Sequence, residues 1–90
     1  MATHKSALKV HRQAQARRLR NRARRSRLRN AMKEYRGALT AGDLERARGL
    51  LPAMLSLVDR TAKAGAVHHN TADRTKGRLT RALNRLAAGS

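Results

Sequence analysis

The amino-acid sequence predicts an all-α fold, a three-helix bundle with a long, protruding, arginine-rich first helix. Three observations support this prediction. The composition is rich in Ala, Leu and Arg, which favour helix, and it contains no Trp, no Phe and one Tyr. Two segments with turn-forming residues, 40–43 and 64–70, divide the chain into three parts. In each part apolar residues recur three or four positions apart, as they do on one face of a helix.

The first helix is expected over about residues 6–39, which is roughly 50 Å of helix. A stripe that can pack on the other helices lies in its second half and consists of Leu28, Met32, Tyr35 and Leu39. Upstream, Leu8, Leu19 and Ala23 share a different face, and the residues around them are too polar for a core. The front half of this helix is therefore expected to project beyond the bundle.

The second helix is expected over about residues 44–64. Asp43 is a good N-cap, and Gly65 suits the left-handed position that follows a helix. One apolar stripe runs along the whole segment and consists of Leu44, Ala47, Leu51, Met54, Leu55, Val58 and Ala62. Pro52 lies inside the helix and removes a backbone hydrogen bond, so we expect the axis to bend there while the helix continues.

The third helix is expected over about residues 71–87. Its shorter apolar stripe consists of Ala72, Leu79, Leu83 and Leu86. Asn70 is the predicted N-cap, with Asp73 three residues later in a weak form of the capping box. The backbone N–H groups at this end either hold a phosphate or belong to an ordinary capped helix, and the residue types alone favour neither.

The charge of the chain is large and unevenly distributed. In residues 1–90, which fit one domain, 22 Lys and Arg stand against 5 Asp and Glu, a net charge of +17. Residues 1–42 hold thirteen of the bases and a single acid, Glu34. Repulsion of this size opposes compaction, so we expect a polyanionic partner, of which nucleic acid is the commonest.

Residues 17–29, which we call the arginine segment, contain eight arginines in thirteen positions. On a helix these arginines cover well over half of the circumference, more than one protein neighbour could cover. Such a charge block is often a solvated or disordered tail. Here helix-forming Leu19 and Ala23 and the absence of Gly and Pro favour an arm that is loose when free and becomes an ordered helix when phosphates neutralise it.

The kind of nucleic acid is indicated by what the chain lacks. Proteins that read single strands stack bases on aromatic side chains, and Tyr35 is the only aromatic residue among Phe, Trp and Tyr here. Phosphate contacts to folded or double-stranded RNA are expected instead. An alternative is a DNA-binding basic-helix or nucleoid protein, because Asn21–Arg27 is similar to part of a leucine-zipper basic region, although Gly37 and Gly42 end the leucine pattern after about two repeats. A cationic amphipathic membrane peptide is a further alternative, with little apolar face to insert.

No catalytic or metal site is predicted. The four histidines, His4, His11, His68 and His69, are too dispersed for a recognisable ligand set, and the chain has no cysteine. Asp43, Glu45 and Asp59 each have a base within four residues and fit capping and surface ion pairs. We therefore expect no enzyme, no cofactor, no metal and no small-molecule substrate. Without a membrane-spanning apolar run or the apolar core of a signal peptide, the chain is expected to be cytoplasmic.

Three ordered motifs resemble one known family. They are residues 1–9 (MATHKSALK), the stretch from Arg20 to Ser26, and residues 65–72 (GAVHHNTA) ahead of Arg74, Lys76, Arg78 and Leu79. In order and spacing, nearly the whole chain is similar to the S-twenty family of bacterial small-subunit ribosomal proteins. The resemblance implies a three-helix bundle with a long first helix, which binds 16S ribosomal RNA directly, makes few protein contacts and supports assembly of the small subunit in the cytoplasm.

The expected RNA-binding residues combine the arginine density with positions implied by the resemblance. In the N-terminal half they are His4, Lys5, Ser6, Lys9, Arg12, Arg17, Arg18, Arg20, Asn21, Arg22, Arg24, Arg25, Ser26, Arg27 and Arg29. In the C-terminal half they are His68, His69, Asn70, Thr71, Arg74, Lys76, Arg78 and Arg81.

Overall fold

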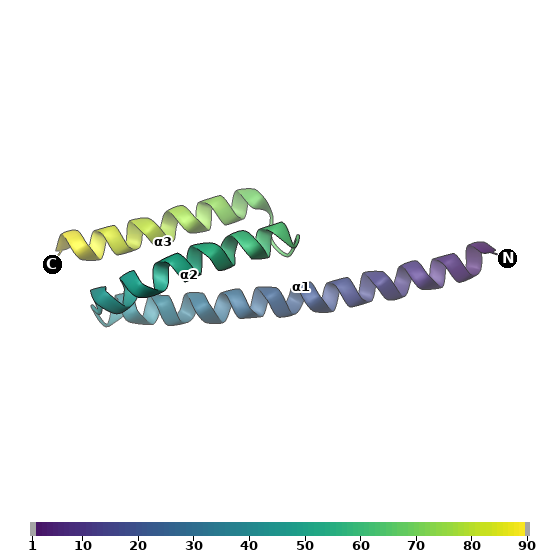
Figure 1. Ribbon diagram of the computed structural model, residues 1–90, viewed down its shortest axis with the longest axis horizontal. Coiled ribbons are helices and arrows are strands. Elements are labelled where there is room, and N and C mark those ends of the chain that lie inside the picture. Colours follow the sequence, from purple (N-terminus) through teal and green to yellow (C-terminus); the bar gives the residue numbers. More distant parts are fainter. Residues whose placement is uncertain (1, 90) are drawn as a thin grey trace.

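A computed structural model describes the backbone of residues 2–89 and the side chains of residues 5–89. Three α-helices follow one another, α1 (Ala2–Thr40), α2 (Leu44–Lys63) and α3 (His69–Gly89), and there is no strand among residues 2–89 (Figure 1). The predicted all-α class is confirmed. Within the described residues, α1 begins four residues before its expected start and α3 begins two residues before.

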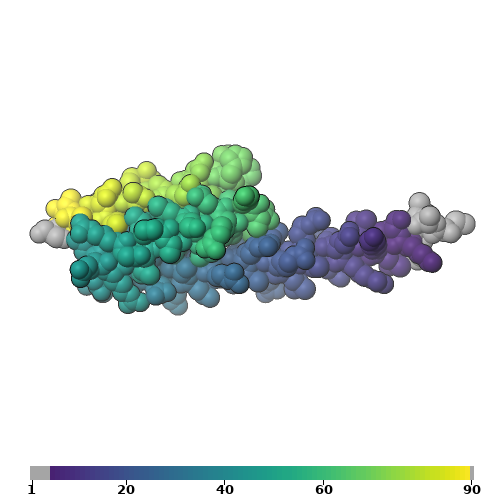
Figure 2. All heavy atoms as spheres, viewed as in Figure 1, coloured from purple at the N-terminus to yellow at the C-terminus, as the bar shows by residue number. Residues whose placement is uncertain are grey.

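The molecule is elongated because only part of α1 packs against the rest of the chain. α2 lies between α1 and α3 and contacts both, whereas α1 and α3 touch each other little (Figure 1). The long dimension is 68 Å, and the radius of gyration is 17.9 Å, against about 12 Å for a compact chain of this length. Residues 5–23 of α1, which we call the arm, extend as a single rod beyond the body formed by residues 24–89 (Figure 2). The predicted protrusion is confirmed.

The core lies where the three predicted apolar stripes meet. Tyr35 and Val58 are completely buried, and the core also contains Leu28, Ala38, Ala47, Met54, Ala72, Leu79 and Leu83. The Tyr35 hydroxyl donates a hydrogen bond of 2.8 Å to the carbonyl oxygen of Leu79, so the one aromatic residue links α1 to α3 across the core. Burial raises the pKa of the Tyr35 hydroxyl above its usual value.

Both turns between helices are set by a glycine with a positive φ. Gly42 (φ 71°) follows α1, and Gly65 (φ 81°) follows α2. After each glycine the next N–H returns to the last helical turn, from Asp43 to the Ala38 carbonyl and from Ala66 to the Thr61 carbonyl. These are Schellman motifs, in which glycine avoids the strain that a side chain would cause at positive φ. The predicted role of Gly65 is confirmed, and so is the Asp43 cap, whose carboxylate accepts from the backbone N–H of Arg46 at 3.1 Å.

The prediction that Asn70 caps α3 is wrong. α3 begins at His69, so the capping position belongs to His68, whose Nδ1 accepts a hydrogen bond from the backbone N–H of Asn70 at 3.1 Å. The His68 carbonyl accepts from the Ala72 N–H and closes the first turn. An imidazole nitrogen two residues before the N–H can take the place of the usual Asn or Ser oxygen, which the residue preferences do not anticipate.

Pro52 does not interrupt α2, which runs unbroken from Leu44 to Lys63. Pro52 is exposed, and so is Arg48, whose carbonyl would have been its hydrogen-bond partner. Water can therefore solvate the freed carbonyl, which limits the cost of the proline. The bend at Pro52 stays a prediction.

Candidate nucleic-acid interface

The arm presents positive charge that no other part of the described chain covers. It carries no Asp or Glu, and its arginines are all exposed. At about 100° per residue, the eight arginines of the arginine segment occupy an arc of roughly 220°, and the remaining arc holds Leu19, Ala23 and Ser26. Leu19 is 67% exposed, so this narrower face is not packed on the body either. Along the arm, most sides of the helix are open to an anionic partner, whereas from Arg24 onward one side packs on the body.

Two arginines of the arginine segment have partners within the molecule. Arg24 Nη1 donates to Asn21 Oδ1 at 3.1 Å, and Arg25 Nη1 donates to the Ala66 carbonyl oxygen at 3.3 Å. Over residues 5–89, no hydrogen bond or ion pair is found for the other predicted arginines of α1, namely Arg12, Arg17, Arg18, Arg20, Arg22, Arg27 and Arg29. Their guanidinium groups keep all their donors for an external acceptor.

The hydrogen bond from Arg25 brings two of the predicted segments together. Ala66 lies in the turn before α3, so this bond holds that turn against the arginine segment, although the two residues are 41 positions apart in sequence. A shallow groove at the same place is lined by Arg25, Leu28, Arg29, Met32 and Val67. The arginine segment therefore adjoins the turn that leads into α3.

The start of α3 is organised by its two histidines. The rings of His68 and His69 stack with centroids 4.3 Å apart, and both side chains are exposed. Because His68 Nδ1 accepts from the Asn70 N–H, one of the free backbone N–H groups at the start of α3 already has a hydrogen-bond partner within the chain. The geometry here is that of an ordinary capped helix, with imidazole edges available at its tip.

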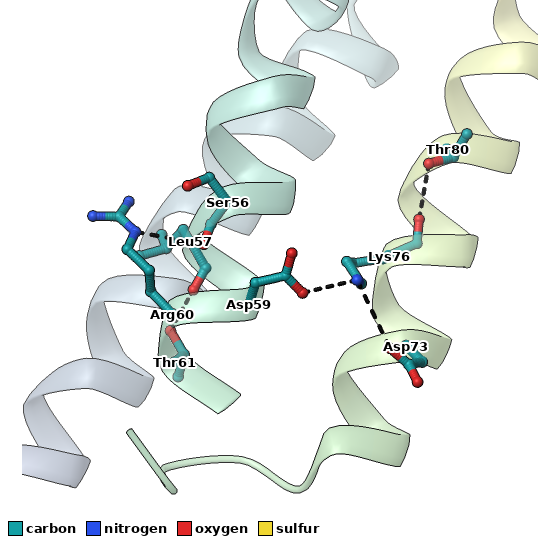
Figure 3. Close-up of polar contacts among 8 residues, drawn as sticks. All are labelled: Ser56, Leu57, Asp59, Arg60, Thr61, Asp73, Lys76 and Thr80. Atoms are coloured by element: carbon teal, nitrogen blue, oxygen red, sulfur yellow. Dashed lines mark hydrogen bonds and ion pairs between the residues drawn. The ribbon is translucent and has the colours of Figure 1, made fainter. Parts of the chain in front are cut away.

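Lys76 has a structural role that its sequence position did not suggest. Its Nζ lies 2.8 Å from Asp59 Oδ1 on α2 and 3.8 Å from Asp73 Oδ1 one turn earlier on α3 (Figure 3). The hydrogen bond to Asp59 is the main reason that the pKa of Lys76 is raised, and the charges of both carboxylates add to it. Lys76 therefore links α2 to α3, and two acids offset its charge.

Other predicted residues of α3 are exposed, including Asn70, Thr71, Arg74, Arg78 and Arg81. A Cβ at Gly77 would lie 3.3 Å from Nη1 of Arg81, at the end of an exposed side chain that can move aside.

The predicted residues at the tip of the arm are not brought near α3. Lys5, Ser6 and Lys9 are exposed in the first turns of α1, at the far end of the molecule from the body (Figure 1). The side chain of His4 lies outside the described residues. The predicted contact residues are therefore spread along the length of the molecule and are not gathered in one pocket.

One basic residue was missed by the sequence reasoning. Arg60, near the end of α2, lines a cleft of about 240 Å³ together with Arg24 and Arg27 of α1. A base in the last turn of a helix is adequately explained by the helix dipole, so nothing in the sequence singled it out. Only the packing of α2 on α1 places it beside the arginine segment.

Other kinds of site are not found in the described part of the chain. No group of three or more His, Asp or Glu side chains is close enough to hold a metal ion among residues 5–89. None of the described helices combines the length and apolar character needed to cross a membrane.

Comparison with known proteins gives a consistent result. The family described as Ribosomal protein S20 matches residues 2–84. A "Small ribosomal subunit protein bS20" of Syntrophobacter fumaroxidans is 43% identical over 86 residues, covering 96% of this chain and 100% of that protein. Proteins of the same name from Nitratidesulfovibrio vulgaris (strain DP4) and Caldicellulosiruptor saccharolyticus are 46% and 39% identical, covering 97% and 98% of this chain and 100% and 89% of theirs.

The helical body, the exposed basic arm and these relatives together define a small structural ribosomal protein without enzymatic activity. The chain belongs to the Ribosomal protein S20 family. The family resemblance predicted from the three motifs is confirmed.

Proposed function

We propose that this chain binds 16S ribosomal RNA directly, through phosphate contacts of α1 and the start of α3, and that this binding supports assembly of the small ribosomal subunit. The observation that carries the proposal is the arginine segment, whose eight arginines are spread over most of the circumference of α1 where the arm leaves the body. A field of this kind is relieved by neutralising phosphates and releasing their counterions. The relatives are named small ribosomal subunit proteins, which supports the small subunit as the place where this RNA binding occurs.

Recognition of RNA shape, more than of base sequence, is supported by the core. Tyr35 is fully buried, so no Phe, Trp or Tyr ring in residues 5–89 is available as a platform for stacked bases. Arginine forks pair well with phosphate oxygens and carry little sequence information in that role. Selectivity would then come from the arrangement of RNA helices around the protein.

The two-sided distribution of charge supports a clamping mechanism. On α1, Arg24 and Arg27 lie on the side of the cleft with α2, whereas Arg25 and Arg29 line the groove beside Val67. These two pairs are roughly 150° apart around the helix axis. Phosphates that neutralise both pairs must approach α1 from two sides, which suits a protein that lies between separate RNA segments. The chain would hold those segments together and make few contacts with other proteins.

The contact residues predicted from the sequence remain our proposal, with a smaller contribution from one of them. Lys76 is offset by Asp59 and Asp73, so we expect it to contribute less to RNA binding than Arg74 or Arg78, which have no such partners in the described chain. Lys5, Ser6 and Lys9 would extend the contact along the arm, together with His4.

Two measurements test the proposal. In sucrose-gradient fractionation of a lysate, the protein should sediment with the small ribosomal subunit, and its presence only in the fractions of free protein would contradict the function. In a competition assay, structured small-subunit ribosomal RNA should displace duplex DNA of equal length. Equal affinity for the two would favour the alternative of a DNA-binding or nucleoid protein.

A further inference from the structure

A cleft between α1 and the last turns of α2 brings three arginines together. It has a volume of about 240 Å³, and its lining contains no carboxylate. The residues that line it are Arg24, Arg27, Leu57, Arg60, Thr61 and Ala64. The lining thus combines small and apolar side chains with arginines from two different helices.

The hydrogen bonds around the cleft leave the guanidinium groups free to bind a ligand there. Arg60 Nε donates to the Ser56 carbonyl at 3.4 Å, which uses one of its five N–H donors. Its neighbour Asp59 turns the other way, toward Lys76 on α3, so this carboxylate is committed on the opposite side of α2 (Figure 3). The Thr61 hydroxyl is also satisfied, because it donates to the Leu57 carbonyl at 2.7 Å.

Arg24 and Arg27 of α1 complete the group of three arginines around the cleft. Arg24 is held by its bond to Asn21, which fixes one edge of its guanidinium and leaves other N–H groups available. Arg27 has no hydrogen bond or ion pair within the described part of the chain. Glu34, the next acid along α1, is already paired with Arg46 at 3.1 Å.

The electrostatics of this arrangement favour an anion. Three like charges around one cleft repel one another, and the nearest acids have other partners. Backbone carbonyls at the C-terminal end of α2 do not take the place of an anion, since the Schellman motif at Gly65 already satisfies the carbonyls of Thr61 and Ala62. Guanidinium forks fit the oxygens of a phosphate, with two parallel N–H···O bonds from each fork.

We propose that this cleft is a specific phosphate-binding site, in which Arg60 of α2 acts with Arg24 and Arg27 of α1. The inference rests on the proposed RNA-binding function and adds a residue outside the arm and outside the start of α3. A phosphate bound here joins α1 to α2 at the base of the arm. The site therefore fixes the direction in which the arm leaves the body when RNA is bound.

The first test compares Arg60→Gln with Arg48→Gln. Arg48 lies on the same helix, roughly three turns earlier, is exposed and does not line the cleft, so the two variants remove the same charge. Affinity for small-subunit ribosomal RNA is measured over a series of salt concentrations, with circular dichroism to check folding. Arg60→Gln should weaken binding about tenfold more than the control and lower the log–log salt slope by roughly 0.9. Arg60→Lys keeps the charge but loses the fork, so it should recover only part of the loss.

The outcomes separate this inference from the function on which it rests. If Arg60→Gln behaves as Arg48→Gln while substitutions in the arm still weaken RNA binding, the cleft is not a phosphate site and the proposed function stands. If substitutions in the arm have no effect either, the proposed function itself fails.

The second test uses inorganic phosphate with the full-length protein free of RNA. The Nε–Hε NMR signals of Arg27 and Arg60 should shift together as phosphate is added at constant ionic strength, while the Arg48 signal stays in place. Uniform small shifts of all arginines would contradict a built site. Specific shifts with phosphate, combined with unchanged RNA affinity of Arg60→Gln, would assign the cleft to a free anion and overturn its role in RNA binding.

Discussion

Replacing four arginines of the arm with glutamine should remove a defined part of the salt dependence of RNA binding. The substitutions are Arg17→Gln, Arg18→Gln, Arg20→Gln and Arg22→Gln. All four side chains are exposed and have no partner in the described chain, and Gln has nearly the helix propensity of Arg. The body should therefore fold as before, and the effect should fall on binding alone.

The magnitude follows from the charge. Each phosphate that is neutralised contributes about 0.9 to the slope of log K against log salt, so four lost contacts should lower the slope by about 3.6. Between 50 and 200 mM salt, a slope difference of this size corresponds to a factor of about 150 in affinity. With about 6 to 10 phosphates contacted in all, the unmodified protein should lose roughly 10³ to 10⁵ in affinity over the same range.

The assay is filter binding or anisotropy with a labelled small-subunit ribosomal RNA fragment at four or more salt concentrations. The control variant removes the same charge from exposed positions that are not predicted to bind RNA, namely Lys33, Arg36, Arg48 and Arg85. It should change the slope by much less. Equal slopes for the arm variant and the control would refute the argument, because binding would then depend on total charge and not on the arm.

Four further predictions concern stability and folding. Tyr35→Phe should lower the free energy of unfolding by about 1 kcal/mol through the lost hydrogen bond to the Leu79 carbonyl, and a urea titration with an unchanged midpoint would contradict this. Folding raises the pKa values of Tyr35 and Lys76, so their contribution to the free energy of unfolding is complete below the unfolded pKa values near pH 10. This contribution is lost at higher pH, as each group passes its folded pKa. An equal free energy of unfolding at pH 9 and above pH 11, measured by urea titration, would disprove it. Gly65→Ala should cost about 1 kcal/mol because φ is 81°, whereas Gly49→Ala in the middle of α2, with open space around its Cβ, should gain about 0.5–1 kcal/mol; thermal melts of the pair should move in opposite directions. The far-UV helical signal should rise when RNA binds, since like charges four residues apart in the arm destabilise the free helix, and an unchanged signal would show that the arm is fully formed without RNA.

The fold was predictable because it is dictated by local signals that agree with one another. The apolar stripes assigned which face of each helix is buried, and the glycine at 65 together with Asp43 marked where α2 begins and ends. The start of α3 was missed because Asn70 has a strong general preference for capping, while the actual acceptor is the Nδ1 of His68. That choice depends on a side-chain rotamer, which residue preferences do not determine.

The candidate interface was predictable only as far as it follows from composition along one helix. The density of arginine in residues 17–29 identified the main basic surface. The linking role of Lys76 could not be foreseen, because its partner Asp59 is on another helix and the pairing depends on how α2 and α3 are rotated. The same is true of Arg60, which joins Arg24 only through the packing of α2 on α1.

The most direct test of the account is a cryo-EM structure of the small ribosomal subunit that contains this protein. Phosphate oxygens of ribosomal RNA should lie within ion-pair distance of the arginine segment on more than one side of α1. An arginine segment that faces bulk solvent, or that is surrounded by protein side chains, would contradict the proposal that RNA backbone neutralises it.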